Sequence, residues 1–514
     1  MTVRAPHGMV SSIDHLASSA GVAALRAGGS AADAAIAANA VLAVTSPYAC
    51  GLGGDLFALV HDGLGTPAAL NASGRAGSGA DPDALRAEGH AAVPYRGDIR
   101  AVTVPGCVDG WLALHRAYGR IPLADVLAPA IGYATDGFPL GATFAARIAE
   151  IDGAPGAEDL WAAGPLPPGT RLRRPGVARA LTAVASGDRA AFYRGEFGTG
   201  LLRLGGGLFT TDDLDRDGAD WTTPLSLRVH GRDVWTSAPN SQGYLVLLGL
   251  AIAEGLDLGD DPDDPRWAHL LVEAARAAGQ DRPEVLHEHA DVTTLLAADE
   301  VGRRRAAIDP DRRAPVPDHV AVGDTTYLCA VDGERRAVSL IQSNAAGFGS
   351  HLFEPATGVN LHNRGLGFSL VPGHPAEYGP GRRPPHTLAP TLVTEPDGAL
   401  AAVAGTMGGD AQPQIMLQVL TRLLRHGTPP GEAVGAPRWG LTGAATGFDT
   451  WDGPDAAVAL EPGHPPAWAD GLRVRGHRVT GTETVGHANA ITVDGDTLAG
   501  AADPRPGIGA AQGY

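Results

Sequence analysis

The sequence contains no lysine, so all 39 of its basic residues are arginine. This absence excludes a phosphate-binding loop that ends in lysine, a Schiff-base lysine and the lysine-dependent amidases. Basic residues are also outnumbered, because 57 acidic residues give the chain a net charge of −18. We therefore expect neither nucleic acid nor an anionic membrane surface as a partner, although a local cluster of arginines could still hold an acidic substrate.

Cysteine is scarce as well. Cys50, Cys107 and Cys329 are odd in number and far apart, which fits neither a disulfide framework nor a zinc site. His287-Glu288-His289 suggests a metal site, but without further ligands such a triplet is more typical of a solvated helix end. We expect no metal and no cofactor.

Long apolar runs are missing. The first residues lack the apolar core of a signal peptide, and no stretch reaches the roughly 18 apolar residues of a membrane span. These absences predict a cytoplasmic protein without a membrane segment.

Aromatic residues make up only 5% of the chain, whereas glycine (71 residues) and alanine are abundant, which favours close packing and many tight turns. Two alanine-rich segments are apolar on every side and predict buried helices, the second with Ser30 as its N-cap. The predicted helices cover 15–27, 30–44, 122–136, 177–186, 242–254, 267–279 and 414–426. The predicted strands cover 56–61, 101–104, 326–331, 336–342, 391–394, 400–404, 487–492 and 497–501. Strand-rich sheets flanked by apolar helices indicate an α+β sandwich with helices outside, built on one sheet or two.

Several different short motifs follow one another in a characteristic order along almost the whole chain. They are Gly28-Gly29-Ser30-Ala31-Ala32-Asp33, Gly51-Leu52-Gly53-Gly54-Asp55, Val104-Pro105-Gly106, Gly323-Asp324-Thr325-Thr326-Tyr327, Gly405-Thr406-Met407-Gly408-Gly409-Asp410 and Ala502-Asp503-Pro504-Arg505. Each is weak by itself, but their order resembles the γ-glutamyltransferase family. The resemblance implies a four-layer αββα sandwich of the N-terminal-nucleophile hydrolases.

The resemblance also implies that the chain cuts its own backbone between Asp324 and Thr325. Residues 1–324 would form the large fragment and 325–514 the small one, and the two would stay associated as a heterodimer or a higher oligomer. Thr325 would then carry both a nucleophilic hydroxyl and an α-amine whose pKa of roughly 8 suits a base. The polar, Pro-rich segment 306–318 before the cut would give it a mobile lead-in.

Further roles carry over by position. Ser343 falls where the family keeps a Thr that hydrogen-bonds the nucleophile. Gly408 and Gly409 match the oxyanion-hole glycines, whose N–H groups can approach a substrate oxygen closely. A tight turn remains the simpler alternative for this glycine pair.

The substrate-binding motifs depart from the family pattern. The arginine that grips the α-carboxylate of a γ-glutamyl group is shifted by two positions, to Arg75. Gly367 stands where the family has an ammonium-binding Asp, and His386-Thr387 replaces a pair of serines. The chain instead is similar to the oxamate amidohydrolase-like branch, with Asn344, Asn363, Arg364, His386 and Thr387 as further substrate-binding candidates. Arg75 and Arg364 could equally be structural ion-pair partners.

These motifs predict a self-processing amide hydrolase that acts on a small amide bearing a carboxylate, such as oxamate. One alternative is γ-glutamyl transfer from, or hydrolysis of, glutathione. Another is an unprocessed homologue that only binds or assembles. The retention of Thr325, Ser343 and the glycine pair argues against the second.

Overall fold

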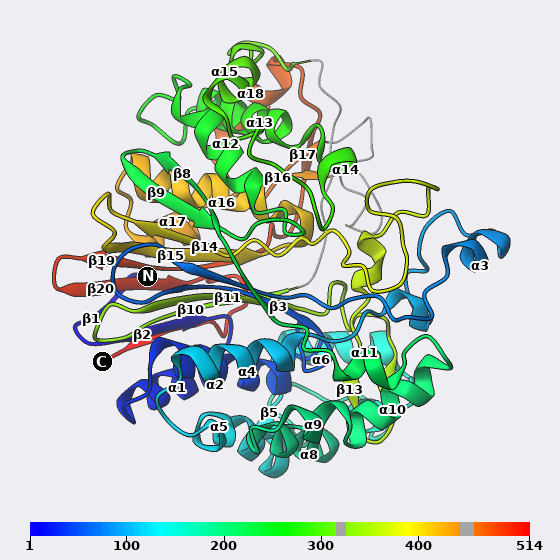
Figure 1. Cartoon of the computed structure of the whole chain (residues 1–514). Coiled ribbons are helices and arrows are strands. Elements are labelled where there is room, and N and C mark those ends of the chain that lie inside the picture. The colour runs from blue at the N-terminus through cyan, green and yellow to red at the C-terminus, as the bar shows by residue number, and fades with distance from the viewer. Residues whose placement is uncertain (315–324, 443–456) are drawn as a thin grey trace.

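Two antiparallel seven-stranded sheets packed face to face form the centre of the molecule (Figure 1). The computed structural model describes residues 1–314, 325–442 and 457–514. The first sheet runs β21 (Ala510–Gly513), β2 (Met9–Ser12), β10 (Thr326–Val331), β11 (Ala337–Ser343), β3 (Asp55–His61), β4 (Ala68–Ala72) and β7 (Asp220–Thr222). The second runs β1 (Val3–Ala5), β20 (Thr497–Ala502), β19 (His487–Asp494), β15 (Leu400–Met407), β14 (Thr391–Thr394), β9 (Arg232–Thr236) and β8 (Leu225–Val229).

Helices cover the outer face of each sheet, giving four αββα layers (Figure 1). The first sheet is covered by α1 (His15–Arg26), α2 (Ala31–Thr45) and α4 (Cys107–Tyr118), with α5 (Leu123–Asp136) packed outside α2 and α8 (Pro175–Ala185) outside α5. The second is covered by α12 (Tyr244–Glu254) and α16 (Gln412–Leu420), with α13 (Pro265–Gly279) packed on both and α18 (Pro466–Val474) on α13. The predicted N-terminal-nucleophile hydrolase sandwich is confirmed. The composition left one sheet or two open, and the structure has two central sheets.

The layers follow from the period-2 alternation of the central strands. In β3, Phe57 and Leu59 point into the core between the sheets, whereas Leu56 and Ala58 pack against the helices. Both faces are therefore buried, and the strand is apolar throughout. On the helical side every residue of α2 is buried, as its alanine-rich composition predicts.

Smaller elements complete the described chain. The helices are α3 (Pro82–Ala87), α6 (Ala142–Arg147), α7 (Glu158–Trp161), α9 (Arg189–Tyr193), α10 (Glu196–Gly205), α11 (Thr211–Asp215), α14 (Arg282–Val285), α15 (Ala298–Ala306) and α17 (Pro430–Gly435). The strands are β5 (Phe138–Pro139), β6 (Arg171–Leu172), β12 (Phe353–Glu354), β13 (Val359–Asn360), β16 (Trp439–Thr442), β17 (Ala457–Leu460) and β18 (Val479–Gly481). No helix within the described ranges is long and apolar enough to cross a membrane.

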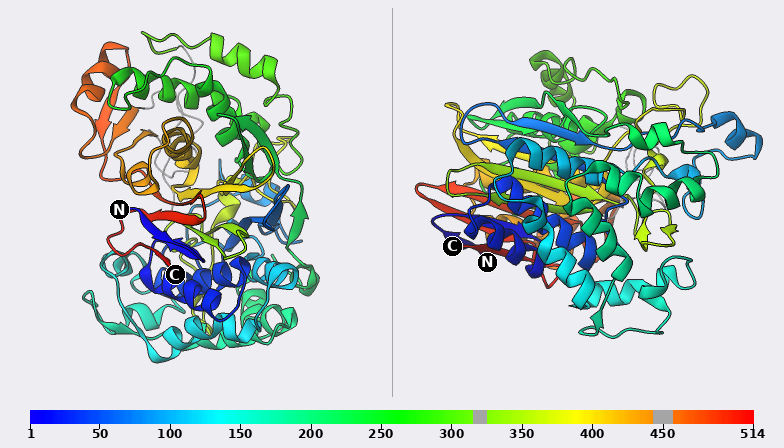
Figure 2. Two further views of the ribbon diagram at one scale, coloured as in Figure 1. Left: turned by 90° about the vertical axis from the view of Figure 1, so that its left-hand side faces the viewer. Right: turned by 60° about the horizontal axis from the view of Figure 1, so that its bottom comes forward.

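Both chain ends are held in the sandwich, where β1 pairs with β20 and β21 with β2 (Figure 2). Most predicted elements are present with ends shifted by a few residues. The strand expected over 101–104 is wrong. A 3₁₀ turn, η1 (Ile99–Ala101), precedes an extended segment in which Val104 N donates to Arg75 O. Its β-branched residues have the propensity for a strand, but no strand in the described part of the chain pairs with them to form a ladder.

Candidate active site

Thr325 and Ser343 lie opposite each other at the ends of two paired strands. β10 and β11 are antiparallel with Thr326 opposite Gln342, which brings Thr325 level with Ser343. The Thr325 hydroxyl donates to Ser343 Oγ over 3.1 Å, and both residues are buried. Thr326 differs, because its hydroxyl donates to the Gln342 carbonyl of its own sheet. The two threonines are thus distinguished by what their side chains face.

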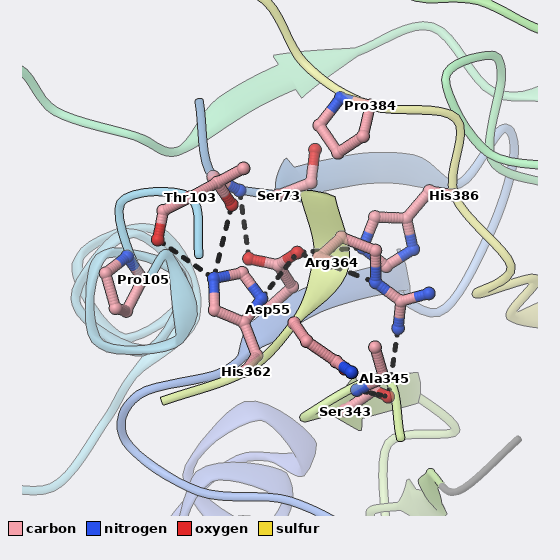
Figure 3. A network of polar contacts seen from close by, with 12 residues as sticks. Asp55, Ser73, Thr103, Pro105, Ser343, Ala345, His362, Arg364, Pro384 and His386 are labelled. Carbon is pink, nitrogen blue, oxygen red and sulfur yellow. Dashed lines mark hydrogen bonds and ion pairs between the residues drawn. The ribbon is translucent and has the colours of Figure 1, made fainter. Parts of the chain in front are cut away.

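Arg364 approaches the same serine from the 3₁₀ turn η3 (Arg364–Gly367). Its Nη2 donates to Ser343 Oγ at 3.0 Å (Figure 3). Its Nη1 donates to Thr387 Oγ1 at 2.9 Å. The side chain is only 1% exposed. Ser343 Oγ therefore bridges the Thr325 hydroxyl and the buried guanidinium of Arg364.

Asp55, the first residue of β3, is the anion nearest to Arg364 among the residues that the structure describes. Its Oδ2 lies 3.9 Å from Arg364 Nε, 2.9 Å from His386 Nε2 and 3.4 Å from His362 Nδ1 (Figure 3). Its Oδ1 accepts from Gly74 N at 2.9 Å. The carboxylate thus joins the strand end to the turn that carries Arg364.

Burial and charge together set the ionisation of this group. Burial lowers the pKa of Arg364 to about 10, against the opposing effect of Asp55 and Asp410. Burial alone would raise the pKa of Asp55, but the facing His362 and His386 hold it below its usual value. Burial and Arg364 lower the pKa of His386 to about 3. At neutral pH the group is therefore a buried arginine cation, an aspartate anion and a neutral His386.

The Gly408-Gly409 pair follows the end of β15, in the sheet that packs against β10. Gly408 has φ 138° and Gly409 φ 54°, conformations that favour glycine. Gln242 Nε2 donates to the carbonyl oxygens of Gly409 and Thr387, at 3.2 and 2.9 Å. The glycine turn is thereby tied to the residue that accepts a hydrogen bond from Arg364.

Arg282 on α14 contacts both Gln242 and Asp410, the residue that follows the glycine pair. Its Nε donates to Gln242 Oε1 at 3.0 Å and its Nη2 to Asp410 Oδ1 at 2.7 Å. Asp410, which follows the glycine pair, is buried and ion-paired. Arg282 therefore braces the turn through both Gln242 and Asp410.

Other predicted substrate-binding residues are engaged within the protein. Arg75 pairs with Glu288 and donates to Gly381 O, so these two partners engage its guanidinium. Both nitrogens of His386 are engaged, Nε2 by Asp55 and Nδ1 by Leu388 N.

The two asparagines shape loops around the site. Asn363 Oδ1 accepts from Ala346 N, and its Nδ2 donates to Tyr95 O. Asn344 Nδ2 donates to Pro47 O. Of the substrate-binding candidates, Arg364 and Thr387 are thus the two whose side chains are linked by hydrogen bonds to Ser343. Asp324 lies outside the described residues.

Gly367 has no room for a side chain. A Cβ there would lie 2.3 Å from Pro385 O, so no carboxylate can occupy this position unless the backbone moves. The glycine is a packing requirement of the turn as well as a departure from the family pattern.

Four further residues of the site carried no sequence prediction of a role: Asp55, Gln242, Arg282 and His362. Asp55 was visible as the end of the Gly51–Asp55 motif, and His362 precedes Asn363. Gln242 and Arg282 belong to no quoted motif, so only the tertiary contacts identify them.

A cavity of about 550 Å³ lies beside the site. Arg282 forms part of its wall, together with Leu366 and Gly367 of η3 and Pro385, which precedes His386. Figure 1 places α14 and the loop of residues 364–385 on the same side of the sandwich.

One side-chain cluster in the described chain has the composition of a metal site. His269, Glu273 and His477 are buried and their ligand atoms lie within 4.8 Å of one another. However, His269 Nδ1 is hydrogen-bonded to His477 Nε2 at 2.8 Å, and Glu273 binds Arg276 and Ala314 N. Hydrogen bonds within the protein thus occupy the cluster. In the triplet at 287–289, Glu288 is the partner of Arg75 and of Arg383 N.

Comparison with known proteins gives a consistent result. The family model for gamma-glutamyltranspeptidase matches residues 17–513. The oxamate amidohydrolase proenzyme of Klebsiella pneumoniae is 38% identical over 99% of this chain and 98% of its own length. The glutathione hydrolase-like YwrD proenzyme of Bacillus subtilis is 36% identical over 98% of each chain.

Among solved structures, a cephalosporin acylase from Bacillus halodurans superposes with a TM-score of 0.90 at 33% identity, over 100% of this chain and 97% of the acylase. Whole-chain similarity in both sequence and fold leaves no part of the molecule unmatched. The chain therefore belongs to the gamma-glutamyltranspeptidase family and is a hydrolase that acts on C–N bonds.

Proposed function

We propose that this protein is a self-processing amidohydrolase that cuts itself before Thr325 and then hydrolyses a small amide bearing a carboxylate, with oxamate as the reference substrate. The observation that carries the proposal is the buried chain Thr325–Ser343–Arg364, with hydrogen bonds of 3.1 and 3.0 Å. It supports the proposal because a single hydrogen-bonded serine, Ser343, lies between the Thr325 hydroxyl and a cation that suits a carboxylate.

In the proposed reaction the freed α-amine of Thr325 takes the proton of its own hydroxyl. Oγ1 then attacks the amide carbon, and the N–H groups of Gly408 and Gly409 stabilise the resulting oxyanion. The amine passes the proton to the leaving nitrogen, and the C–N bond breaks. Water finally hydrolyses the Thr325 ester and releases the acid. Each oxyanion donor contributes roughly 3–4 kcal/mol in comparable acyl-transfer sites.

The substrate class follows from the charges around Ser343. A carboxylate next to the scissile carbonyl can pair with Arg364, which is cationic at neutral pH. An α-ammonium group would need an anion, and the tight packing of Gly367 leaves no place there for the carboxylate that the family uses. This favours oxamate over a γ-glutamyl group. The Klebsiella relative is named for the same amide.

Two alternatives are retained as outcomes of the test. A γ-glutamyl transferase or glutathione hydrolase would prefer glutathione to oxamate. A non-catalytic binding homologue would remain one chain and hydrolyse neither. The association of the fragments, any higher oligomer and the cytoplasmic location stay predictions.

The experiment combines processing with turnover. Purified protein should yield a small fragment that begins Thr-Thr-Tyr-Leu-Cys on N-terminal sequencing, and kcat/KM should be higher for oxamate than for glutathione. Thr325→Ala should abolish both cleavage and hydrolysis, while Thr326→Ala should retain both. An intact 52.4 kDa chain that hydrolyses oxamate would contradict the role of Thr325.

A further inference from the structure

The cavity beside the site is much larger than an oxamate ion requires. Its volume of about 550 Å³ is within the range of pockets that enclose drug-sized ligands. Its walls are mainly apolar, and the rings of Phe368 and Tyr95 contribute to them. Val371 at the wall is 60% exposed, which is unusual for a large apolar side chain in this protein. These features call for an apolar occupant.

The cavity is lined by residues that adjoin the proposed catalytic site on two sides. On one side Leu366 and Gly367 belong to the same turn as Arg364. On the other side Arg282 lines the cavity and also contacts Asp410, directly after the glycine pair. A substrate held between Arg364 and the glycine turn would therefore have this space next to it.

The covalent structure of an oxamate decides which part of the substrate can enter the cavity. In an oxamate the carboxylate is bonded directly to the scissile carbonyl, so Arg364 and the glycine turn account for the whole acyl half. Any further group must be attached to the amide nitrogen. No carboxylate lines the cavity among the described residues, and Arg282 is cationic, so the lining opposes an amine half that carries an ammonium group.

We propose that this cavity binds the apolar amine half of an N-substituted oxamate, with an aromatic ring as the best-fitting group. The inference rests on the proposed function and extends it to a substrate class. The reaction is the one described above: the C–N bond breaks, the leaving nitrogen takes the proton from the α-amine, and water releases oxalate from Thr325. The products are oxalate and an apolar primary amine. The aromatic walls suit a ring because aromatic pairs add stabilisation beyond the buried area.

The test compares N-benzyloxamate with N-methyloxamate on the processed enzyme. Both leave as alkylamines, so their difference reports mainly on binding of the ring. We expect kcat/KM to be roughly ten-fold or more higher for the benzyl compound, because a buried ring removes a large apolar area from water. Ala92→Trp, at an exposed position of the cavity wall, should abolish this preference while leaving hydrolysis of oxamate itself near the wild-type rate.

Ala87→Trp is the matched control. Ala87 is also exposed, lies five positions earlier at the end of α3 and is not part of the cavity wall, so the benzyl preference should persist in this variant. Equal kcat/KM values for the two amides in the wild type, or a preference that survives Ala92→Trp, would overturn the inference and leave the proposed function standing. A processed wild type that hydrolyses none of the three amides would overturn both.

Discussion

Replacing Arg364 by methionine should weaken substrate binding more than it slows the chemical step. The variant keeps an unbranched side chain of similar reach but loses the guanidinium that donates to Ser343 and Thr387. If Arg364 pairs with the substrate carboxylate, the lost charged hydrogen bonds amount to about 1.5–3 kcal/mol. That corresponds to a fall in kcat/KM of roughly ten- to 150-fold, carried mainly by KM.

The same substitution has a cost in stability. Asp55 would remain buried without its nearby cation, and breaking a buried ion pair costs about 3–5 kcal/mol. The present pair is 3.9 Å apart, and Asp55 keeps its hydrogen bonds to His386 and Gly74 N, so we expect the lower end, about 3 kcal/mol. Urea unfolding measures this loss, and steady-state kinetics with oxamate measure kcat and KM.

Arg174→Met separates the two effects. Arg174 is as deeply buried as Arg364, pairs with Asp159 at 3.0 Å and donates to Gly358 O at 2.7 Å, at the start of α8. This variant should also lose stability but keep the wild-type KM. A folded Arg364→Met protein with wild-type KM for oxamate would refute the assignment of the carboxylate to Arg364.

Four further predictions follow from individual contacts. Ser343→Ala should lower kcat about five-fold in processed enzyme, because the acceptor of the Thr325 hydroxyl is lost and that hydrogen bond is worth roughly 1 kcal/mol; a loss as complete as that of Thr325→Ala would reverse the two roles. Gln242→Leu should lower kcat with little change in KM, because it frees the Gly409 carbonyl; an effect confined to KM would remove it from the oxyanion turn. Stability should fall on acidification, because burial lowers the pKa values of His386, His477 and His487 to about 3, 3 and 4. Below pH about 6.5 the unfolded chain protonates these histidines, whereas the native protein does not. The stability that the three buried histidines contribute is therefore complete above that pH and is lost as the pH falls toward 3–4. Each histidine costs on the order of 1.4 kcal/mol per pH unit; urea midpoints at pH 7.5 and 5.0 measure this, and His386→Gln should reduce the difference. Finally, Cys50, Cys107 and Cys329 are buried with raised thiol pKa values, about 12 for Cys50, so a thiol reagent should label them only in urea and leave activity unchanged.

The sandwich with helices outside could be predicted from local patterns, whereas its division into four layers was implied by the family resemblance. The continuous apolar run of residues 56–60 and the all-round apolarity of residues 30–44 each require burial on two sides, whatever their neighbours are. The segment 101–104 shows the limit of this reasoning. It has the composition of a strand, yet its hydrogen bonds depend on the loop at Arg75, which lies far from it in sequence.

In the candidate site, too, some features could be predicted from the sequence and others could not. The spacing from Thr325 to Ser343 is that of two adjacent antiparallel strands joined by a turn, so the sequence itself predicts that their hydroxyls meet. The positions of the arginines could not be predicted, because a long side chain is directed by whichever anion or acceptor the fold brings near it. Glu288 pairs with Arg75, whereas Arg364 donates to Ser343 and Thr387 and lies near Asp55.

The sequence by itself thus determined the four layers, the family and the pairing of Thr325 with Ser343, since each depends on short-range periodicity or on ordered motifs. Only the tertiary structure decided which arginine lies beside that pair, that Gln242 and Arg282 support the glycine turn, and that Gly367 has no space for a side chain. The physical reason is that these properties arise from contacts between segments separated by tens to hundreds of residues, and such contacts leave no periodic signal in the chain.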